Sequence, residues 1–160
     1  MLIREAVHGD YEAVHRLHQQ VHRAHVEARP DLFVFELPTL DRSLFWSLIS
    51  DHLTKVLLLV NEKQKIVAYA IVRFIDIPKM YGFISRRTLY VTDLCVDEKI
   101  RGAGYGKLFF EKISDFAKRH HVDALELDVY AWNVKAQGFY YQMGMSSQKM
   151  TMEYKITPIQ

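Results

Sequence analysis

The stretch EKIRGAGYGKLFF, residues 98–110, places glycines at positions 102, 104 and 106, directly before an apolar segment with helical spacing. Glycine allows a sharp backbone turn and lets a ligand approach the main-chain amides closely. The start of a helix adds N–H groups without intrahelical partners and a partial positive charge, and both favour an anion. The stretch therefore predicts a binding site for a phosphorylated molecule.

Two common phosphate-binding motifs do not match this loop. A P-loop requires GxxxxGK followed by Ser or Thr, but Arg101 stands at the first glycine position and Leu108 at the hydroxyl position. The dinucleotide-binding motif requires GxGxxG after the first strand of a parallel unit, whereas this chain has GxGxG late in its sequence. Glu126 does lie at the distance of the ribose-binding acid, which leaves a dinucleotide-binding oxidoreductase module as an alternative.

Length and composition indicate one globular domain over residues 1–160. The chain is 49% hydrophobic and 25% charged, which is ordinary for a protein with a buried core. Its net charge of +2 gives no reason to expect nucleic acid or a membrane surface as a partner. Cys95 is the single cysteine, and the segment MLIREAVHGD carries charges where a signal peptide is apolar. We therefore expect a cytoplasmic protein.

Hydrophobic periodicity predicts a mixed α/β fold with the order β-α-α-β-β-β-α-β-α-β. The predicted strands are residues 2–7, a hairpin over 55–77 with NEKQK as its turn, 86–96, 124–130 and 148–156. The predicted helices are residues 10–28 with Asp10 as N-cap, 41–53 capped by Asp41 or Thr39, the segment from the glycine loop to His120, and 133–143. Gly144 is placed as a left-handed helix stop. These elements form a mostly antiparallel sheet flanked by helices, with one β-α-β crossover around the glycine loop.

A second motif follows the strand at 124–130. Residues 133–145 read NVKAQGFYYQMGM, and the glycine loop itself reads R-x-x-G-x-G from Arg101 to Gly106. Together the two motifs resemble the GCN5-related N-acetyltransferase (GNAT) family, whose helix pattern is N-x-x-A-x-x-F-Y-x-x-x-G-[FM]. The resemblance covers roughly residues 88–146, and the N-terminal half matches only in its order of elements.

The resemblance implies acetyl-CoA as co-substrate, with no metal. Main-chain groups of the strand TDLCV would pair with pantetheine, the amides of the glycine loop would bind the diphosphate, and the helix from Asn133 would place the reacting end. The residues expected to bind the cofactor are Leu94, Cys95, Val96, Arg101, Gly102, Ala103, Gly104, Tyr105, Gly106, Lys107, Asn133 and Ala136.

Acyl transfer to an amine needs a proton donor for the leaving thiolate and a proton acceptor for the amine. Tyr140 is the expected general acid, because a phenol still carries its proton at neutral pH. Asp93 is the expected base, although it reads equally well as a paired structural acid. Three residues of the neighbouring strand, acting through water, are the alternatives: Glu126, Asp128 and Tyr130.

A covalent acyl-cysteine route would need an activating base beside Cys95, and no histidine lies near it in TDLCV. Direct transfer is therefore favoured. His15, His18, His22 and His25 share the first helix, and His18 and His22 have the i, i+4 spacing of a metal pair. No HExxH pattern accompanies them, so we expect this face, with Phe33, Phe35 and Trp46, to border the acceptor pocket or solvent.

The sequence thus predicts an N-acetyltransferase that moves an acetyl group from acetyl-CoA to a primary amine in a ternary complex. The acceptor is a small-molecule amine or a peptide N-terminus, and the terminal strand 148–156 offers a route to a homodimer. A non-catalytic acyl-CoA sensor on the same fold remains the main alternative.

Overall fold

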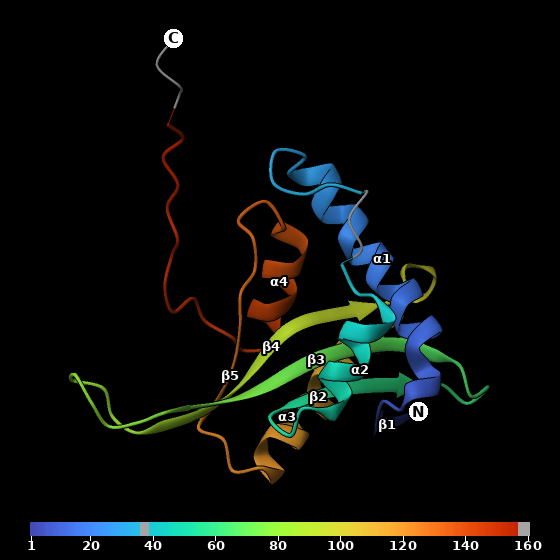
Figure 1. Cartoon of the computed structure of the whole chain (residues 1–160), viewed down its shortest axis with the longest axis horizontal. Helices are drawn as coiled ribbons and strands as arrows, with labels where there is room; N and C mark the ends of the chain where they lie inside the picture. The colour runs from blue at the N-terminus through green and yellow to red at the C-terminus, as the bar shows by residue number, and fades with distance from the viewer. Residues whose placement is uncertain (36–38, 157–160) are drawn as a thin grey trace. The chain divides into compact units, whose positions relative to one another are not determined.

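The computed structural model describes residues 1–35 and 39–156, which contain one five-stranded sheet (Figure 1). The strands are β1 (Leu2–Glu5), β2 (Thr54–Val60), β3 (Ile66–Ile77), β4 (Arg86–Val96) and β5 (Ala124–Leu127). Neighbours in the order β1-β2-β3-β4 are antiparallel, and β5 is parallel to β4. The predicted mostly antiparallel sheet with one crossover is confirmed.

The predicted hairpin over 55–77 forms β2 and β3, joined at Asn61. The Asn61 N–H donates to the Lys65 carbonyl at 2.9 Å, and the Asn61 side chain accepts from the N–H groups of Lys63 and Lys65. Such Asx turns are a common reason for asparagine at chain reversals. Both faces of β2 are buried, which accounts for its unbroken run of apolar residues.

Helices cover both faces of the sheet in the first compact unit, Met1–Asp128. On one face α1 (Tyr11–Ala28) and α2 (Arg42–Ser50) bury Leu17 and Phe45 against β2 and β3, and on the other α3 (Tyr105–Arg119) buries Phe109. Alternation along the strands divides the core, because Leu57 and Leu59 lie on the α3 side while Leu58 lies on the α1 side. Among the described helices, none is both long and apolar enough to cross a bilayer.

The second compact unit, Val129–Gln160, contains α4 (Val134–Gln142). The Asn133 side chain caps it by accepting from the Ala136 N–H at 3.2 Å, and Gly144 ends it in the left-handed region at φ 85°. Both boundaries match the expectation from the sequence.

The predicted strand over 148–156 is wrong for the described chain, because residues 145–156 form neither helix nor strand. Their apolar alternation provides a strand-like face, but a strand also needs a hydrogen-bonding edge beside it, which the sequence pattern does not supply. Three other elements are shorter than predicted: the first strand ends at Glu5, the second helix at Ser50 and the fifth strand at Leu127.

Asp10 occupies the N-cap position of α1 but does not cap it with its side chain. Its carboxylate instead accepts from Arg4 Nη1 at 2.7 Å, from Arg4 Nη2 at 2.8 Å and from the Val7 N–H at 2.8 Å. The hydrogen bonds from Arg4 are the main reason that the pKa of Asp10 lies below its ordinary value of 3.8. This contact ties β1 to the start of α1 across the 3₁₀ turn η1 (His8–Asp10).

Replacing Asp10 by Asn removes the negative charge of a buried carboxylate that pairs with the partly exposed Arg4 guanidinium, so we expect Asp10→Asn to lower the free energy of unfolding at pH 7 by about 1–3 kcal/mol. Because the folded-state pKa is the lower one, this contribution is present above the unfolded value of 3.8 and is lost as pH falls through the folded value. Urea denaturation of both proteins at pH 7 and at acid pH measures the difference.

Glu12→Gln provides the matched control, because Glu12 pairs with Arg42 on the exposed surface of the same helix. That pair should contribute no more than about 0.5 kcal/mol. Equal losses for the two variants would contradict a special role for Asp10.

Candidate active site

Strands β4 and β5 separate after a short stretch of pairing. Their register runs only from Thr88 opposite Ala124 to Val91 opposite Leu127, while β4 continues to Val96. The end of β4 therefore extends past the last residue of β5 with which it pairs. This leaves an edge of β4 that faces away from β3.

The backbone alternation of β4 determines which groups face this edge. The Asp97 N–H donates to the Val67 carbonyl, and in an antiparallel pair such bonds recur at every second residue, so Asp93 and Cys95 direct their main-chain groups at β3. Leu94 and Val96 direct theirs to the edge that faces away from β3, where an extended ligand could add as a further strand.

Two residues expected beside pantetheine are engaged within the protein. The Val96 carbonyl accepts from Arg101 Nε at 2.9 Å, so Arg101 reaches back along the strand. Cys95 is buried in the core on the α1 side, and burial raises the pKa of its thiol to about 11. Cys95 therefore contributes packing, and at neutral pH it is not a thiolate.

The glycine loop links β4 to α3 through two left-handed residues. The 3₁₀ turn η2 (Glu98–Ile100) is capped by Asp97, and both Gly102 and Gly104 have φ of 82°. A Cβ added at either glycine would meet no protein atom within 4 Å, so backbone conformation rather than packing requires them.

The first helical hydrogen bond of α3 runs from the Leu108 N–H to the Gly104 carbonyl. The N–H groups of Tyr105, Gly106 and Lys107 come before it, where the helix offers no carbonyl four residues earlier. Open space beside Gly102 and Gly104, first-turn amides and the Lys107 charge together fit a diphosphate. Ala103 lies between the two glycines on this turn.

Helix α1 contacts the residues that lead into the glycine loop. Arg16 Nη1 donates to Asp97 Oδ2 at 2.6 Å, and the Gln20 side chain accepts from the Glu98 N–H at 2.9 Å. The sequence contains no signal for these contacts, because their partners lie far apart in the chain and neither side forms a motif.

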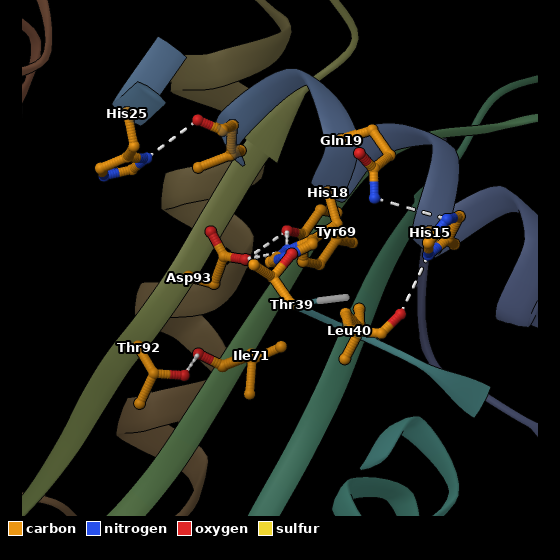
Figure 2. A network of polar contacts seen from close by, with 11 residues as sticks. His15, His18, Gln19, His25, Thr39, Leu40, Tyr69, Ile71, Thr92 and Asp93 are labelled. Carbon is orange, nitrogen blue, oxygen red and sulfur yellow. Dashed lines mark hydrogen bonds and ion pairs between the residues drawn. The ribbon is translucent and has the colours of Figure 1, made fainter. Parts of the chain in front are cut away.

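Asp93 lies in a polar cluster between α1 and the sheet (Figure 2). It accepts from the Tyr69 hydroxyl, and its Oδ2 lies 2.9 Å from His18 Nδ1. On the other side of the imidazole ring, His18 Nε2 lies 2.7 Å from Thr39 Oγ1. The side chains of His18 and Asp93 are each 15% exposed. The structure thus gives the predicted base two hydrogen-bonded neighbours, which favours its reading as a paired acid.

The histidine spacing on α1 has an explanation other than a metal pair. His22 Nε2 lies 2.8 Å from the Val34 carbonyl, whereas His18 faces Asp93. In residues 1–35 and 39–156 no three His, Cys, Asp or Glu side chains are grouped to hold a metal ion. Sequence reasoning identified His18 but not its partners, since neither Tyr69 nor Thr39 belongs to a recognisable pattern.

The alternative bases on the neighbouring strand also have partners. Glu126 pairs with Arg86 at 2.9 Å. Burial, followed by a hydrogen bond with Asp128, raises the pKa of Tyr90 to about 12. Both carboxylates thus interact with side chains of β4.

The residues expected at the reacting end lie in the second unit. Asn133 precedes α4 and Tyr140 lies on it, two turns apart and on nearly the same azimuth, with Ala136 between them. The Tyr140 ring packs edge-on against Phe139, with ring centroids 5.3 Å apart. Tyr130 stacks on Trp132 in the segment before the helix.

Comparisons with known proteins identify the fold and the family of the chain. The chain is similar over 98% of its length to all of a mutant BH1408 protein from Bacillus halodurans, with 46% identity and a TM-score of 0.93. It shares its fold with an aminoglycoside N-acetyltransferase solved in complex with CoA, at 11% identity and a TM-score of 0.69, covering 98% of this chain and 100% of the other.

A curated relative, L-ornithine N5-acetyltransferase NATA1 of Arabidopsis thaliana, is 34% identical over 67 residues, which are 42% of this chain but 29% of the relative. The match thus spans less than a third of that relative's length. The profile of the Acetyltransferase (GNAT) family matches residues 13–145 of the chain. The chain is therefore a member of the Acetyltransferase (GNAT) family.

Proposed function

We propose that this chain moves an acetyl group from acetyl-CoA directly to a primary amine, with both substrates bound at once. The observation that carries the proposal is the open edge of β4, which runs into a loop with two left-handed glycines at the start of α3. In a GNAT chain this arrangement offers main-chain donors and acceptors to a CoA molecule along its length.

Three parts of the chain would hold the co-substrate. Leu94 and Val96 would pair with the pantetheine amides, the amides from Gly102 to Lys107 would bind the diphosphate, and Asn133 and Ala136 would border the reacting end. Bound acetyl-CoA supplies a thioester whose acyl carbon is open to attack. The protein's task is then to orient that carbon and to move two protons.

Direct transfer is supported by the state of the single cysteine. A covalent acyl-cysteine intermediate would need a thiolate nucleophile, but burial raises the pKa of the Cys95 thiol to about 11. We therefore propose that the amine nitrogen forms its bond to the acyl carbon in one complex, and that the carbon–sulfur bond breaks without a protein-bound intermediate.

Tyr140 is the proposed donor to the leaving sulfur. Phenols titrate near ~10 and thiols near ~8.5, so a tyrosine carries a proton to donate at neutral pH. Its position on the same stripe of α4 as Asn133 supports this role.

The proposed class of amine substrate rests on the chemistry of acyl transfer and on one relative. The matching relative is named for acetylation of the N5 amine of ornithine, and we propose a small-molecule primary amine of this kind, with a peptide N-terminus as the second choice. The remaining predictions from the sequence belong to the same proposal: one domain over 1–160, a cytoplasmic location, a homodimer and no nucleic-acid partner.

Thiol release from acetyl-CoA in the presence of a panel of amines tests the function. We expect release with at least one primary amine, and stabilisation of the protein against heat by CoA but not by NADH. Tight CoA binding without release by any amine would instead identify a sensor, and stabilisation by NADH alone would identify the dinucleotide-binding alternative.

Gly104→Ala should weaken CoA binding. Alanine at φ 82° is strained by about 1 kcal/mol, and relaxing the strain would turn the first amides of α3 away from the diphosphate. We expect at least a tenfold loss of CoA affinity by calorimetry. Gly82→Ala is the control, because Gly82 has a similar φ of 84° and equally open surroundings, outside the loop. Equal affinity in the two variants would contradict the proposed diphosphate site.

Tyr140→Phe should lower kcat by about 100-fold or more, because it removes the proposed proton donor and keeps the ring. The Kd for CoA should stay within about twofold, since the phenol hydroxyl is not proposed to hold the co-substrate. Tyr141→Phe, the same change at the exposed neighbouring residue, should leave both quantities unchanged. Full turnover of the Tyr140 variant would remove this residue from the mechanism.

A further inference from the structure

The polar cluster around Asp93 joins four segments of the first unit. His18 comes from α1, Thr39 from the connector before α2, Tyr69 from β3 and Asp93 from β4 (Figure 2). The Tyr69 ring is fully buried, and His18 and Asp93 are mostly buried. A hydroxyl, an imidazole and a carboxylate thus lie in line inside the protein, an arrangement able to move a proton.

The hydrogen-bond partners fix which nitrogen of His18 carries the proton. Burial, together with the charge and hydrogen bond of Asp93, raises the pKa of Tyr69 well above its ordinary value. Its hydroxyl therefore keeps its proton and donates it to Asp93. His18 Nδ1 lies 2.9 Å from both the Tyr69 oxygen and Asp93 Oδ2, so it faces two acceptors and must itself be the protonated nitrogen.

In the neutral ring the basic lone pair is then on Nε2, which lies 2.7 Å from Thr39 Oγ1. A proton arriving at Nε2 would form an imidazolium whose charge Asp93 balances directly. The Asp93 Oδ2 atom already accepts from both Tyr69 and His18.

The cluster lies beside the edge proposed to bind the co-substrate. Asp93 is followed directly on β4 by Leu94, whose main chain faces that edge. The side chain of Cys95, two residues after Asp93, faces the same α1 side as the cluster. Asp93, which holds the imidazole on the α1 side of β4, is therefore the direct chain neighbour of a residue on the edge proposed to bind pantetheine.

We propose that His18 is the final acceptor of the proton from the acceptor amine, that the Thr39 hydroxyl passes it to Nε2, and that Asp93 positions the ring. This inference rests on the proposed acetyl transfer. The ammonium N–H bond breaks as the Thr39 oxygen takes the proton, and the Thr39 O–H proton moves to Nε2. The neutral amine then attacks the acyl carbon, its second proton goes to solvent, and Tyr140 protonates the leaving sulfur and regains a proton from solvent. The imidazolium releases its proton to solvent before the next turnover.

Steady-state kinetics across pH with the intact protein test the relay. We expect His18→Gln and Thr39→Val to lower kcat at least about 100-fold at neutral pH, with CoA affinity within about twofold of the unmodified protein. The fall of kcat/KM on the acid side, produced by protonation of the imidazole, should disappear in both variants. Tyr69 and Asp93 are the titratable groups that face His18 from β3 and β4, and they are unchanged in these variants.

Thr39→Ser restores the hydroxyl and should recover most of the turnover, which a merely structural role for the threonine methyl would not predict. His15→Gln is the matched control on the same helix, because His15 Nδ1 lies 2.9 Å from the Leu40 carbonyl but faces no carboxylate. The His15→Gln variant should still show the fall of kcat/KM at low pH.

The outcomes separate this inference from the function on which it rests. Turnover by the unmodified protein, together with an acid limb retained in both His18→Gln and Thr39→Val, would overturn the relay and leave acetyl transfer intact. Lack of acetyl transfer by the unmodified protein to every amine would overturn both. If His18→Gln fails to fold, the isosteric Thr39→Val decides the question by itself.

Discussion

The structure depends on the point where β4 loses its partner. A strand interior is normally hydrogen-bonded on both sides, and main-chain groups without partners are costly unless water or a ligand meets them. Here β5 pairs with β4 over four register positions and then ends, while β4 continues toward the glycine loop. The extension pairs with β3 on its other side, after a register shift where Ile71 lies opposite Asp93 and Val72 opposite Val91.

Strand β4 directs its main-chain groups and its side chains toward different surroundings. The main chain of Leu94 and Val96 faces the open edge, and the side chains of Asp93 and Cys95 face α1. This division follows from the period of two in a β-strand and needs no special residue. In the proposed mechanism, binding of the co-substrate and movement of a proton would therefore use different groups of β4 that lie within a few residues of each other.

Local signals predicted most of the fold. Asn61 in the hairpin turn, the left-handed Gly102 and Gly104, and the Asn133 cap each act through their own neighbours, so their patterns are readable in one sequence. Asp10 shows the limit of such reading: it stands where a cap belongs, but the guanidinium of Arg4 binds it more strongly than a helix amide does.

The long-range contacts were not predictable in the same way. The residues that meet Asp93 come from three other segments, and only the folded sheet brings them together. The predicted strand over 148–156 was wrong for a related reason. Alternation of apolar and polar residues describes a single strand, whereas a sheet needs a second strand to pair with it. Candidate ligand-binding residues were thus readable from motifs, and the partners that tune them were not.

Helix α1 touches both sides of the site. Arg16 holds Asp97 before the glycine loop, and two residues later His18 holds Asp93. Because these side chains leave one rigid helix within a single turn, a shift of the helix axis moves both anchors together. A movement of α1 would therefore change the position of the segment before the glycine loop and that of the imidazole at the same time.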